Sequence, residues 1–258
     1  MRSKFNSVFA FAAASVITLG CVGTSLAATI GVSNVGGTWT STDPTNPPGL
    51  AGIGTNSVSW GKPLSRKKSG YSFVGAAAGQ IETGVDFNLG TFTHNNFVIK
   101  EGTSIRGAGL GVVVNLVIGG LNQVVNAAFN FNHWETKNKP KRGAACANGG
   151  ANRTGVNASG CADRVTILDN AATQETFVID GFKYILEITG FTRGGELFSE
   201  FWTQENKANS AILRARFTLV GSVDPVDPPP SPVPLPAAGW MVLTGLGALA
   251  AARARRKS

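Results

Sequence analysis

Apolar and polar residues alternate along the central part of this 258-residue chain. Ala127, Phe129, Phe131 and His133 occupy every second position, and asparagines stand between the last three. A period of two is typical of a β-strand that turns one face toward a hydrophobic core. Patterns of this kind predict strands at Ser57–Trp60, Tyr71–Val74, Val85–Ile99, Gly111–Ile118, Val124–Trp134, Arg164–Leu168, Glu175–Ile179, Lys183–Phe191 and Ala211–Gly221.

The last predicted strand and one predicted turn also favour a β-sheet fold. Leu213, Ala215, Phe217 and Leu219 are predicted to share one face of the last strand. Asp180-Gly181 separates two apolar segments, which is a strong signal for a two-residue hairpin. No long segment has a helical period. We therefore expect an all-β body, a single antiparallel β-sandwich of jelly-roll type.

The first 27 residues have the pattern of a secretory signal peptide. Arg2 and Lys4 precede a helical apolar segment at 8–19, and small residues lead to a cleavage site after Ala27, with Ala28 as the alternative. We therefore predict that the chain is exported and that residues 28–222 form the folded body.

The C-terminal region predicts a stalk, a membrane helix and a basic tail. Seven prolines fall within 223–236, which favours an extended spacer. Residues 237–252 carry no charge and would span about 24 Å as a helix. The basic residues of 253–257 are expected to stay in the cytoplasm by the positive-inside rule. The body would then lie outside the cytoplasm.

Most of the net positive charge of the chain comes from these two terminal segments. There are 23 Lys and Arg against 15 Asp and Glu, a net charge of +8. A basic balance can indicate nucleic-acid binding. Six of the basic residues, however, lie in the two terminal segments, so 17 basic and 15 acidic residues remain. The charge therefore indicates membrane topology rather than a nucleic-acid partner.

The C-terminus also resembles a known sorting signal. The sequence Val233-Pro234-Leu235-Pro236-Ala237, the apolar segment and the terminal arginines are similar to the VPLPA-CTERM variant of PEP-CTERM signals. The resemblance covers 233–258. It implies a Gram-negative envelope and processing near the motif by an exosortase-type membrane transpeptidase.

The body resembles a second group. Residues 87–99, with Thr93-His94-Asn95-Asn96 at their centre, look like the signature of THxN-family proteins and of the choice-of-anchor K domain. Val98 stands where that pattern has Pro. The resemblance covers roughly 55–222 and implies a secreted β domain, without implying an activity.

The cysteines predict one disulfide. Cys21 lies in the signal peptide, where it also resembles a lipobox cysteine, so lipidation is an open alternative. Cys146 and Cys161 remain, and two cysteines in an oxidising compartment are expected to pair. The enclosed loop would then either order an insertion or present a polar surface to a partner.

Two histidines limit the available chemistry. His133 continues an apolar face, which favours a buried structural role over that of a base. His94 lies among Thr and Asn residues, which favours a hydrogen-bonding element, with ligand binding as the alternative. The pattern lacks the spacing of a zinc site, and we predict no cofactor and no metal ligand.

Carboxylate pairs give no clear catalytic centre. Glycosidases need two carboxyl groups about 5–10 Å apart. The pairs Glu82/Asp86 and Glu196/Glu200 would lie about 13 Å apart along a strand. A distant pair such as Glu187 with Glu200 stays open, as does calcium at an Asp- or Asn-rich loop.

We therefore predict an exported bacterial protein of the cell surface or extracellular matrix, structural or adhesive and not an enzyme. It would first be held in the inner membrane by 237–252. Its partners would be the Sec translocon and the exosortase-type enzyme. Exopolysaccharide is a candidate ligand for the basic loops 66–68 and 137–142. The alternative is a secreted enzyme or carbohydrate-binding module that acts on surface polysaccharide.

Overall fold

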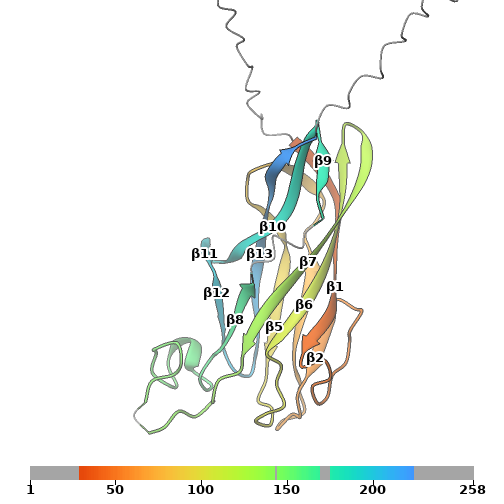
Figure 1. Cartoon of the computed structure of the whole chain (residues 1–258). Helices are drawn as coiled ribbons and strands as arrows, with labels where there is room; N and C mark the ends of the chain where they lie inside the picture. Colours follow the sequence, from red (N-terminus) through yellow and green to blue (C-terminus); the bar gives the residue numbers. More distant parts are fainter. Residues whose placement is uncertain (1–28, 143, 169–174, 224–258) are drawn as a thin grey trace, which may run out of the picture. The chain divides into compact units, whose positions relative to one another are not determined.

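The computed structural model describes residues 29–142, 144–168 and 175–223, and these residues form two antiparallel β-sheets that pack face to face (Figure 1). The first sheet has the order β12 (Glu200–Thr203), β8 (Asp163–Leu168), β7 (Leu121–Trp134), β6 (Gly107–Ile118), β1 (Thr29–Asp43), β4 (Gly79–Glu82). The second has the order β11 (Glu196–Phe198), β10 (Phe182–Arg193), β13 (Lys207–Ser222), β5 (Phe87–Asn96), β3 (Ser69–Gly75), β2 (Ser57–Trp60), and β9 (Phe177–Ile179) pairs with β10. A single 3₁₀ turn, η1 (Gly155–Asn157), interrupts the loop between β7 and β8.

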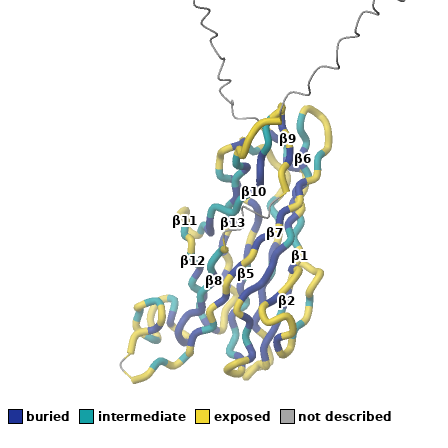
Figure 2. The backbone as a smooth tube through the Cα atoms, in the orientation of Figure 1, coloured by how far each residue is buried: buried dark blue, intermediate teal, exposed yellow. Residues whose placement is uncertain are grey.

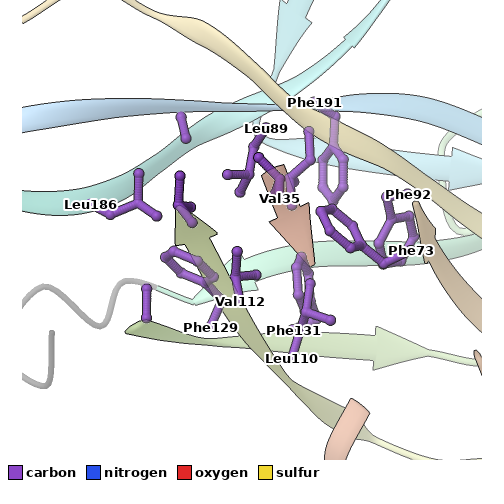
Figure 3. Close-up of a cluster of buried hydrophobic side chains, with 14 of the residues drawn as sticks. Val35, Phe73, Leu89, Phe92, Leu110, Val112, Phe129, Phe131, Leu186 and Phe191 are labelled. Carbon is purple, nitrogen blue, oxygen red and sulfur yellow. The ribbon is translucent and has the colours of Figure 1, made fainter. Parts of the chain in front are cut away.

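The core lies between the facing sides of the two sheets. Figure 3 shows Phe129 and Phe131 of the first sheet directed toward Phe92 and Phe191 of the second. The rings of Phe92 and Phe131 are 5.3 Å apart. Each such side chain contributes about 1.5–3 kcal/mol when it leaves water, so this aromatic layer stabilises the contact between the two sheets. Along β7, buried and exposed residues alternate from Val125 onward. Figure 2 shows buried segments along the strands and exposed residues in the loops.

The predicted strands agree with the structure, and four further strands were not predicted. β1 is the largest of these. Its alternation is broken by irregularities in its register against β6, between Val32 and Asn34 and between Trp39 and Ser41. Three glycines also reduce its apolar content. One of them, Gly37, is needed, because a Cβ there would lie 2.4 Å from the ring of Phe73.

Two detailed predictions have opposite outcomes. The hairpin at Asp180-Gly181 is confirmed, since Ile179 pairs with Phe182 and both turn residues have positive φ, 49° and 80°. Leu219 was wrongly assigned to the core face, because it is 44% exposed. The pairing of β13 with β5 ends at Ala215, and Leu219 lies beyond the last core layer.

The body has two distinct ends. Thr29 pairs with Glu82, and the backbone N–H of Gly84 donates to the carbonyl of Phe217, so β1 begins near the place where β13 approaches its end. The long loop between β7 and β8 lies at the opposite end (Figure 1). We call this opposite end, with the loops at 61–68, 97–106, 135–162 and 204–206, the loop end.

Several predictions fall outside the described residues. These are the signal peptide with its cleavage site at Ala27 or Ala28, the sorting motif Val233–Ala237, the membrane helix 237–252 and all of the stalk except Val223. Within the described ranges, the structure has no helix with the length and apolarity that a membrane crossing requires.

Candidate functional site

A group of buried polar side chains closes the core at the loop end. It comes from the last residues of β5, β7 and β12 and from the first residues of β3, β8 and β13, because antiparallel strands bring these ends together. His94, His133 and Asp163 are its central members, and all three are buried. Polar groups in such a place need partners, since burial without a hydrogen bond costs free energy.

The predicted motif Thr93-His94-Asn95-Asn96 lies on β5, and its residues alternate between the two faces of the sheet. Thr93 faces outward and shares a hydrogen bond with Ser210 on β13 at 2.8 Å. His94 and Asn96 are fully buried. Asn95 is half-buried and pairs with Ala208 along the ladder.

Thr203 of β12 holds the buried half of the motif. His94 Nδ1 lies 2.8 Å from Thr203 Oγ1, and Asn96 Nδ2 donates to the carbonyl of Thr203 at 3.1 Å. Thr203 belongs to the first sheet and the motif to the second, so these bonds join the sheets. They are contacts of the hydrogen-bonding type that the sequence favoured for His94.

The protonation of His94 follows from this geometry. The single hydroxyl proton of Thr203 is donated to the carbonyl of Asp163 at 3.1 Å, so His94 Nδ1 must carry the proton in its own bond. His94 Nε2 is then an acceptor, and it has no partner. Burial, and secondly the nearby His133, lower the pKa of His94 well below its usual value. His94 is therefore a neutral imidazole.

His133 makes a second connection between the sheets. Its Nδ1 lies 2.7 Å from the hydroxyl of Tyr71 on β3, and both residues are buried. Burial raises the pKa of Tyr71, and the charges of Asp163 and Glu135 add to this effect. Tyr71 therefore keeps its proton and can donate it to His133. On the other side of the ring, His133 Nε2 lies 3.4 Å from Glu135 Oε2.

Asp163 begins β8 and has no exposed surface. Its Oδ1 accepts the backbone N–H of Thr136 at 2.6 Å, whereas its Oδ2 has no partner. Burial raises the pKa of Asp163 well above its usual value, and the charge of Glu135 raises it further, against the opposing bond from Thr136.

Glu205 lies in the turn between β12 and β13 and is also without exposed surface. Neither of its carboxylate oxygens accepts a hydrogen bond, although the amides of Asn138 and Asn96 are close enough to oppose the change in its pKa. Burial, and secondly the charge of Glu135, raise the pKa of Glu205 from 4.5 to about 7.

Glu135 connects this buried group to the surface. It follows β7, is half-buried, and accepts a hydrogen bond from Ser104 Oγ at 2.9 Å. His133, Glu135 and Asn138 line a cleft of about 560 Å³ at the loop end. Its other lining residues are Ile99, Lys100, Glu101, Gly102, Ser104, Ile105, Arg106, Trp134, Thr136, Lys137 and Lys139.

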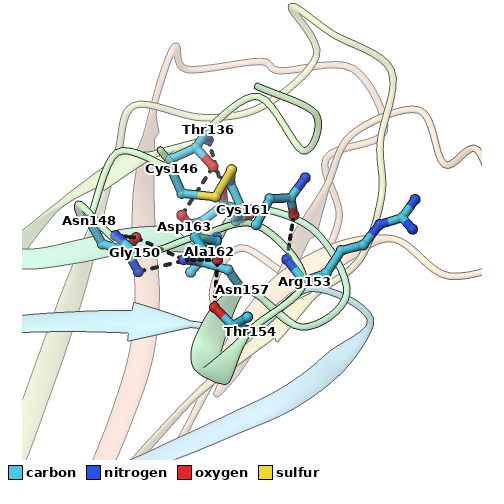
Figure 4. The surroundings of a disulfide bond; sticks show 12 residues. Thr136, Cys146, Asn148, Gly150, Arg153, Thr154, Asn157, Cys161, Ala162 and Asp163 are labelled. Carbon is cyan, nitrogen blue, oxygen red and sulfur yellow. Dashed lines mark hydrogen bonds between the residues drawn. A yellow bond between two sulfur atoms is a disulfide. The ribbon is translucent and has the colours of Figure 1, made fainter. Parts of the chain in front are cut away.

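The predicted disulfide between Cys146 and Cys161 is present, and it closes the long loop beside this group (Figure 4). Thr136 Oγ1 lies within hydrogen-bond distance of the carbonyls of Cys161 and Ala162 at the base of the loop. Within the loop, the amides of Asn148 and Asn157 bond to each other. The loop is therefore ordered by polar contacts and one covalent link rather than by a core of its own.

The carboxylates considered as catalytic candidates have other partners. Asp86 pairs with Arg216 at 2.8 Å, and Glu200 pairs with Arg164 at 3.0 Å. Glu187 accepts a hydrogen bond from Thr218. Glu187 lies on β10 and Glu200 on β12, so that pair is divided between the two sheets. Glu82 and Glu196 are exposed at the ends of β4 and β11.

Tyr71, Glu135, Asp163 and Glu205 were not predicted from the sequence to belong to one group. They are far apart along the chain and meet only through the strand pairing of both sheets. One signal was available, because each carboxylate stands directly at a predicted strand end or in a turn. An acidic residue at that place is ordinarily a solvated turn residue, so the signal did not single them out.

No protein-family model matches this chain, and a search of curated proteins gives no match. The resemblances to the VPLPA-CTERM signal and to the THxN group therefore depend on the motifs quoted above.

Proposed function

We propose that this chain is an exported bacterial protein of the cell surface or extracellular matrix, with a structural or adhesive role. Its signal peptide directs it to the Sec translocon, and its C-terminal helix holds it in the inner membrane. An exosortase-type transpeptidase then processes it near Val233–Ala237. In its finer classification the body is a jelly-roll-like sandwich between a signal helix and a transmembrane helix.

The observation that carries the proposal is the arrangement of the body's two ends. The predicted signal peptide and stalk continue from the end where β1 begins and β13 finishes. The loop end lies at the opposite end of the body from these two strand ends. The disulfide supports export, because such bonds persist in oxidising compartments.

The charge of the loop end favours an acidic ligand. The loop at 61–68 carries Arg66, Lys67 and Lys68, and all three side chains are exposed. The basic segment 137–142 emerges from the same end of the sandwich, and its Lys and Arg residues are exposed. Positive groups gathered on one end raise the local concentration of an anionic polymer. We therefore propose acidic polysaccharide as the class of ligand.

A binding experiment tests this role. Full-length protein in detergent is presented to acidic and to neutral polysaccharides in a low-salt buffer and in a high-salt buffer. We expect binding to the acidic polymers that weakens with salt, since exposed charges are screened. A variant with Gln at Lys137, Lys139, Lys141 and Arg142 is expected to bind at least tenfold more weakly.

The matched control changes Lys183 and Arg193 to Gln, because these lie on β10 and not in the basic loops. Its binding should equal that of the wild type. Absence of binding to every polysaccharide, or equal weakening in both variants, would contradict the adhesive role. Release of sugar from a polysaccharide by the wild type would instead favour the alternative, a secreted enzyme.

A further inference from the structure

Two carboxylates and an imidazole converge beside the cleft at the loop end. One ligand atom from each of His133, Glu135 and Asp163 lies within 4.8 Å of the other two. His133 Nε2 and Glu135 Oε2 are 3.4 Å apart. Two ligands with bonds of about 2.1 Å to a tetrahedral Zn²⁺ are separated by roughly the same distance. The spacing therefore matches that of a metal site, and the half-buried side chain of Glu135 can move to shorten the longer distances.

The buried acceptors of this group are a second and separate observation. Asp163 has no exposed surface, and its Oδ2 has no partner. Glu205 is equally buried, and neither of its oxygens has a partner. Asp163 keeps one close donor, the Thr136 N–H, and Glu205 has only more distant amides nearby, so neither carboxylate recovers all the hydrogen bonds that it would make in water. Both acids are influenced by the charge of Glu135, so the three carboxylates occupy one neighbourhood.

The protein does not balance these acids with its own cations. Among the residues that the structure describes, no Lys or Arg forms an ion pair with Glu135, Asp163 or Glu205. The lysines that line the cleft are exposed, and one of them, Lys137, forms an ion pair with the exposed Glu101. Buried carboxylate oxygens that lack a close donor, in a group with no Lys or Arg partner, favour a bound cation at this place.

We propose that His133, Glu135 and Asp163 bind one divalent metal ion, with the carboxylate of Glu205 beside them. The mixture of one nitrogen with carboxylate oxygens selects the ion, because imidazole suits Zn²⁺ and related transition ions while carboxylate suits Mn²⁺ as well. Ca²⁺ takes oxygen ligands only, so His133 argues against it. The expected ions are Zn²⁺ or Mn²⁺.

The surroundings of His133 support this use of its ring. A histidine that binds a metal through one nitrogen ordinarily donates a hydrogen bond through the other. His133 Nδ1 already lies 2.7 Å from the Tyr71 oxygen. In the metal-bound form Nδ1 would carry the proton and donate it to the Tyr71 oxygen, the reverse of the direction in the metal-free protein, and Nε2 would be free to bind the ion.

The position of the site suggests what the ion does. Glu135 precedes and Asp163 follows the segment 136–162, which contains the disulfide. An ion held by both carboxylates would therefore clamp the base of this loop, where Thr136 already donates to Asp163. The cleft that His133 and Glu135 line provides access for the ion. The site is separate from the sorting signals and does not depend on the proposed function.

The test uses full-length protein that carries no histidine tag and is stripped with a chelator. ZnCl₂, MnCl₂ and CaCl₂ are titrated separately, and bound metal is counted after gel filtration. We expect about one Zn²⁺ or Mn²⁺ per chain, with a rise in the melting temperature. Failure of both ions to bind saturably, or saturable binding of Ca²⁺ alone, would overturn the proposal.

Variants identify the ligands. Glu135→Gln and Asp163→Asn keep size and hydrogen-bonding oxygens, and each is expected to weaken binding at least 100-fold. Glu101→Gln is the matched control, because it removes an exposed carboxylate from the same cleft. It should bind as the wild type does. Unchanged affinity in both ligand variants would overturn the assignment.

A measurement on the wild type covers the case in which a ligand variant does not fold. The chain has only two histidines, His94 and His133. X-ray absorption of the Zn²⁺ or Mn²⁺ complex is expected to show one imidazole together with oxygen ligands, and His133→Gln should remove the imidazole signal. A metal shell without imidazole would overturn the proposal, and so would a shell whose imidazole persists in His133→Gln.

Discussion

The hydroxyl of Tyr71 lies 2.7 Å from His133 Nδ1, and this contact joins the two sheets through the interior of the body. Tyr71 belongs to β3 and His133 to β7. The bond lies between aromatic neighbours, with the ring of Trp60 4.8 Å from that of Tyr71 and 5.4 Å from that of His133. Together with the bonds of His94 and Asn96 to Thr203, this contact links the two sheets at the loop end.

Removal of this bond should therefore be costly. In Tyr71→Phe the ring stays, and His133 Nδ1 becomes a buried acceptor without a donor. We expect the free energy of unfolding to fall by about 1–3 kcal/mol, as measured by urea denaturation. Thr93→Val is the control, because it breaks the outward-facing bond to Ser210, and it should cost less than about 0.5 kcal/mol. Equal losses in the two variants would contradict the role of Tyr71.

The hydroxyl of Thr203 is predicted to be the central link of the motif on β5. It receives the bond from His94 and donates to Asp163, so Thr203→Val leaves two buried groups unsatisfied at nearly constant volume. We expect a loss of about 2 kcal/mol. Thr203→Ser keeps the hydroxyl and should recover most of that loss. A serine variant that is no more stable than the valine variant would show that the hydroxyl is not the cause.

The buried Glu205 predicts a pH dependence of stability in protein kept free of metal. Its pKa is raised from 4.5 to about 7 in the folded chain, so the fold favours the protonated form. This contribution is fully present below pH 4.5 and is lost as the pH rises to about 7. The full shift corresponds to at most about 3–4 kcal/mol.

Glu205→Gln is neutral at every pH and should flatten this part of the profile. The measurement is the melting temperature between pH 4 and pH 8 in the presence of a chelator. Glu101→Gln, an exposed carboxylate, should leave the slope unchanged. A Glu205→Gln profile as steep as that of the wild type would rule out Glu205 as the titrating group.

The disulfide is predicted to stabilise the chain by restricting its unfolded form. Cys146 and Cys161 are 15 positions apart in the sequence, and a closed loop of about that length contributes about 3 kcal/mol. Replacement of both cysteines by alanine should lower the free energy of unfolding by roughly that amount. Treatment with a reductant should destabilise the wild type to the same level and leave the double variant unaffected. A reductant effect in the double variant would point to another cause.

Strands in which buried and exposed residues alternate could be predicted from the sequence. Strands whose position depends on distant pairing partners could not. β7 keeps a strict period of two, because its whole length lies in one sheet with one buried face. In β1 the bulges and the approach of Phe73 to Gly37 depend on partners that the local sequence does not identify. β11 and β12 are short and take their positions from pairing with β10 and β8.

Less of the candidate site than of the fold could be predicted from the sequence. A hydrogen-bonding role for His94 was expected from its Thr and Asn neighbours, but its partner Thr203 is 109 positions away and was not indicated by the local sequence. The convergence of Glu135, Asp163 and Glu205 could not be expected, since it requires both the β7–β8 pairing and the β12–β8 pairing to be known. Local pattern predicts the face of a strand, whereas a site of this kind needs the relative positions of several strand ends.

Export followed by C-terminal processing is the central claim, and the intact mass of the protein from its native envelope tests it most directly. We predict a mature chain that begins after Ala27 or Ala28, contains the Cys146–Cys161 disulfide, and has lost the residues that follow the Val233–Ala237 region. A mature product that still ends at Ser258 would contradict the proposed sorting, and one that still begins at Met1 would contradict the proposed signal cleavage.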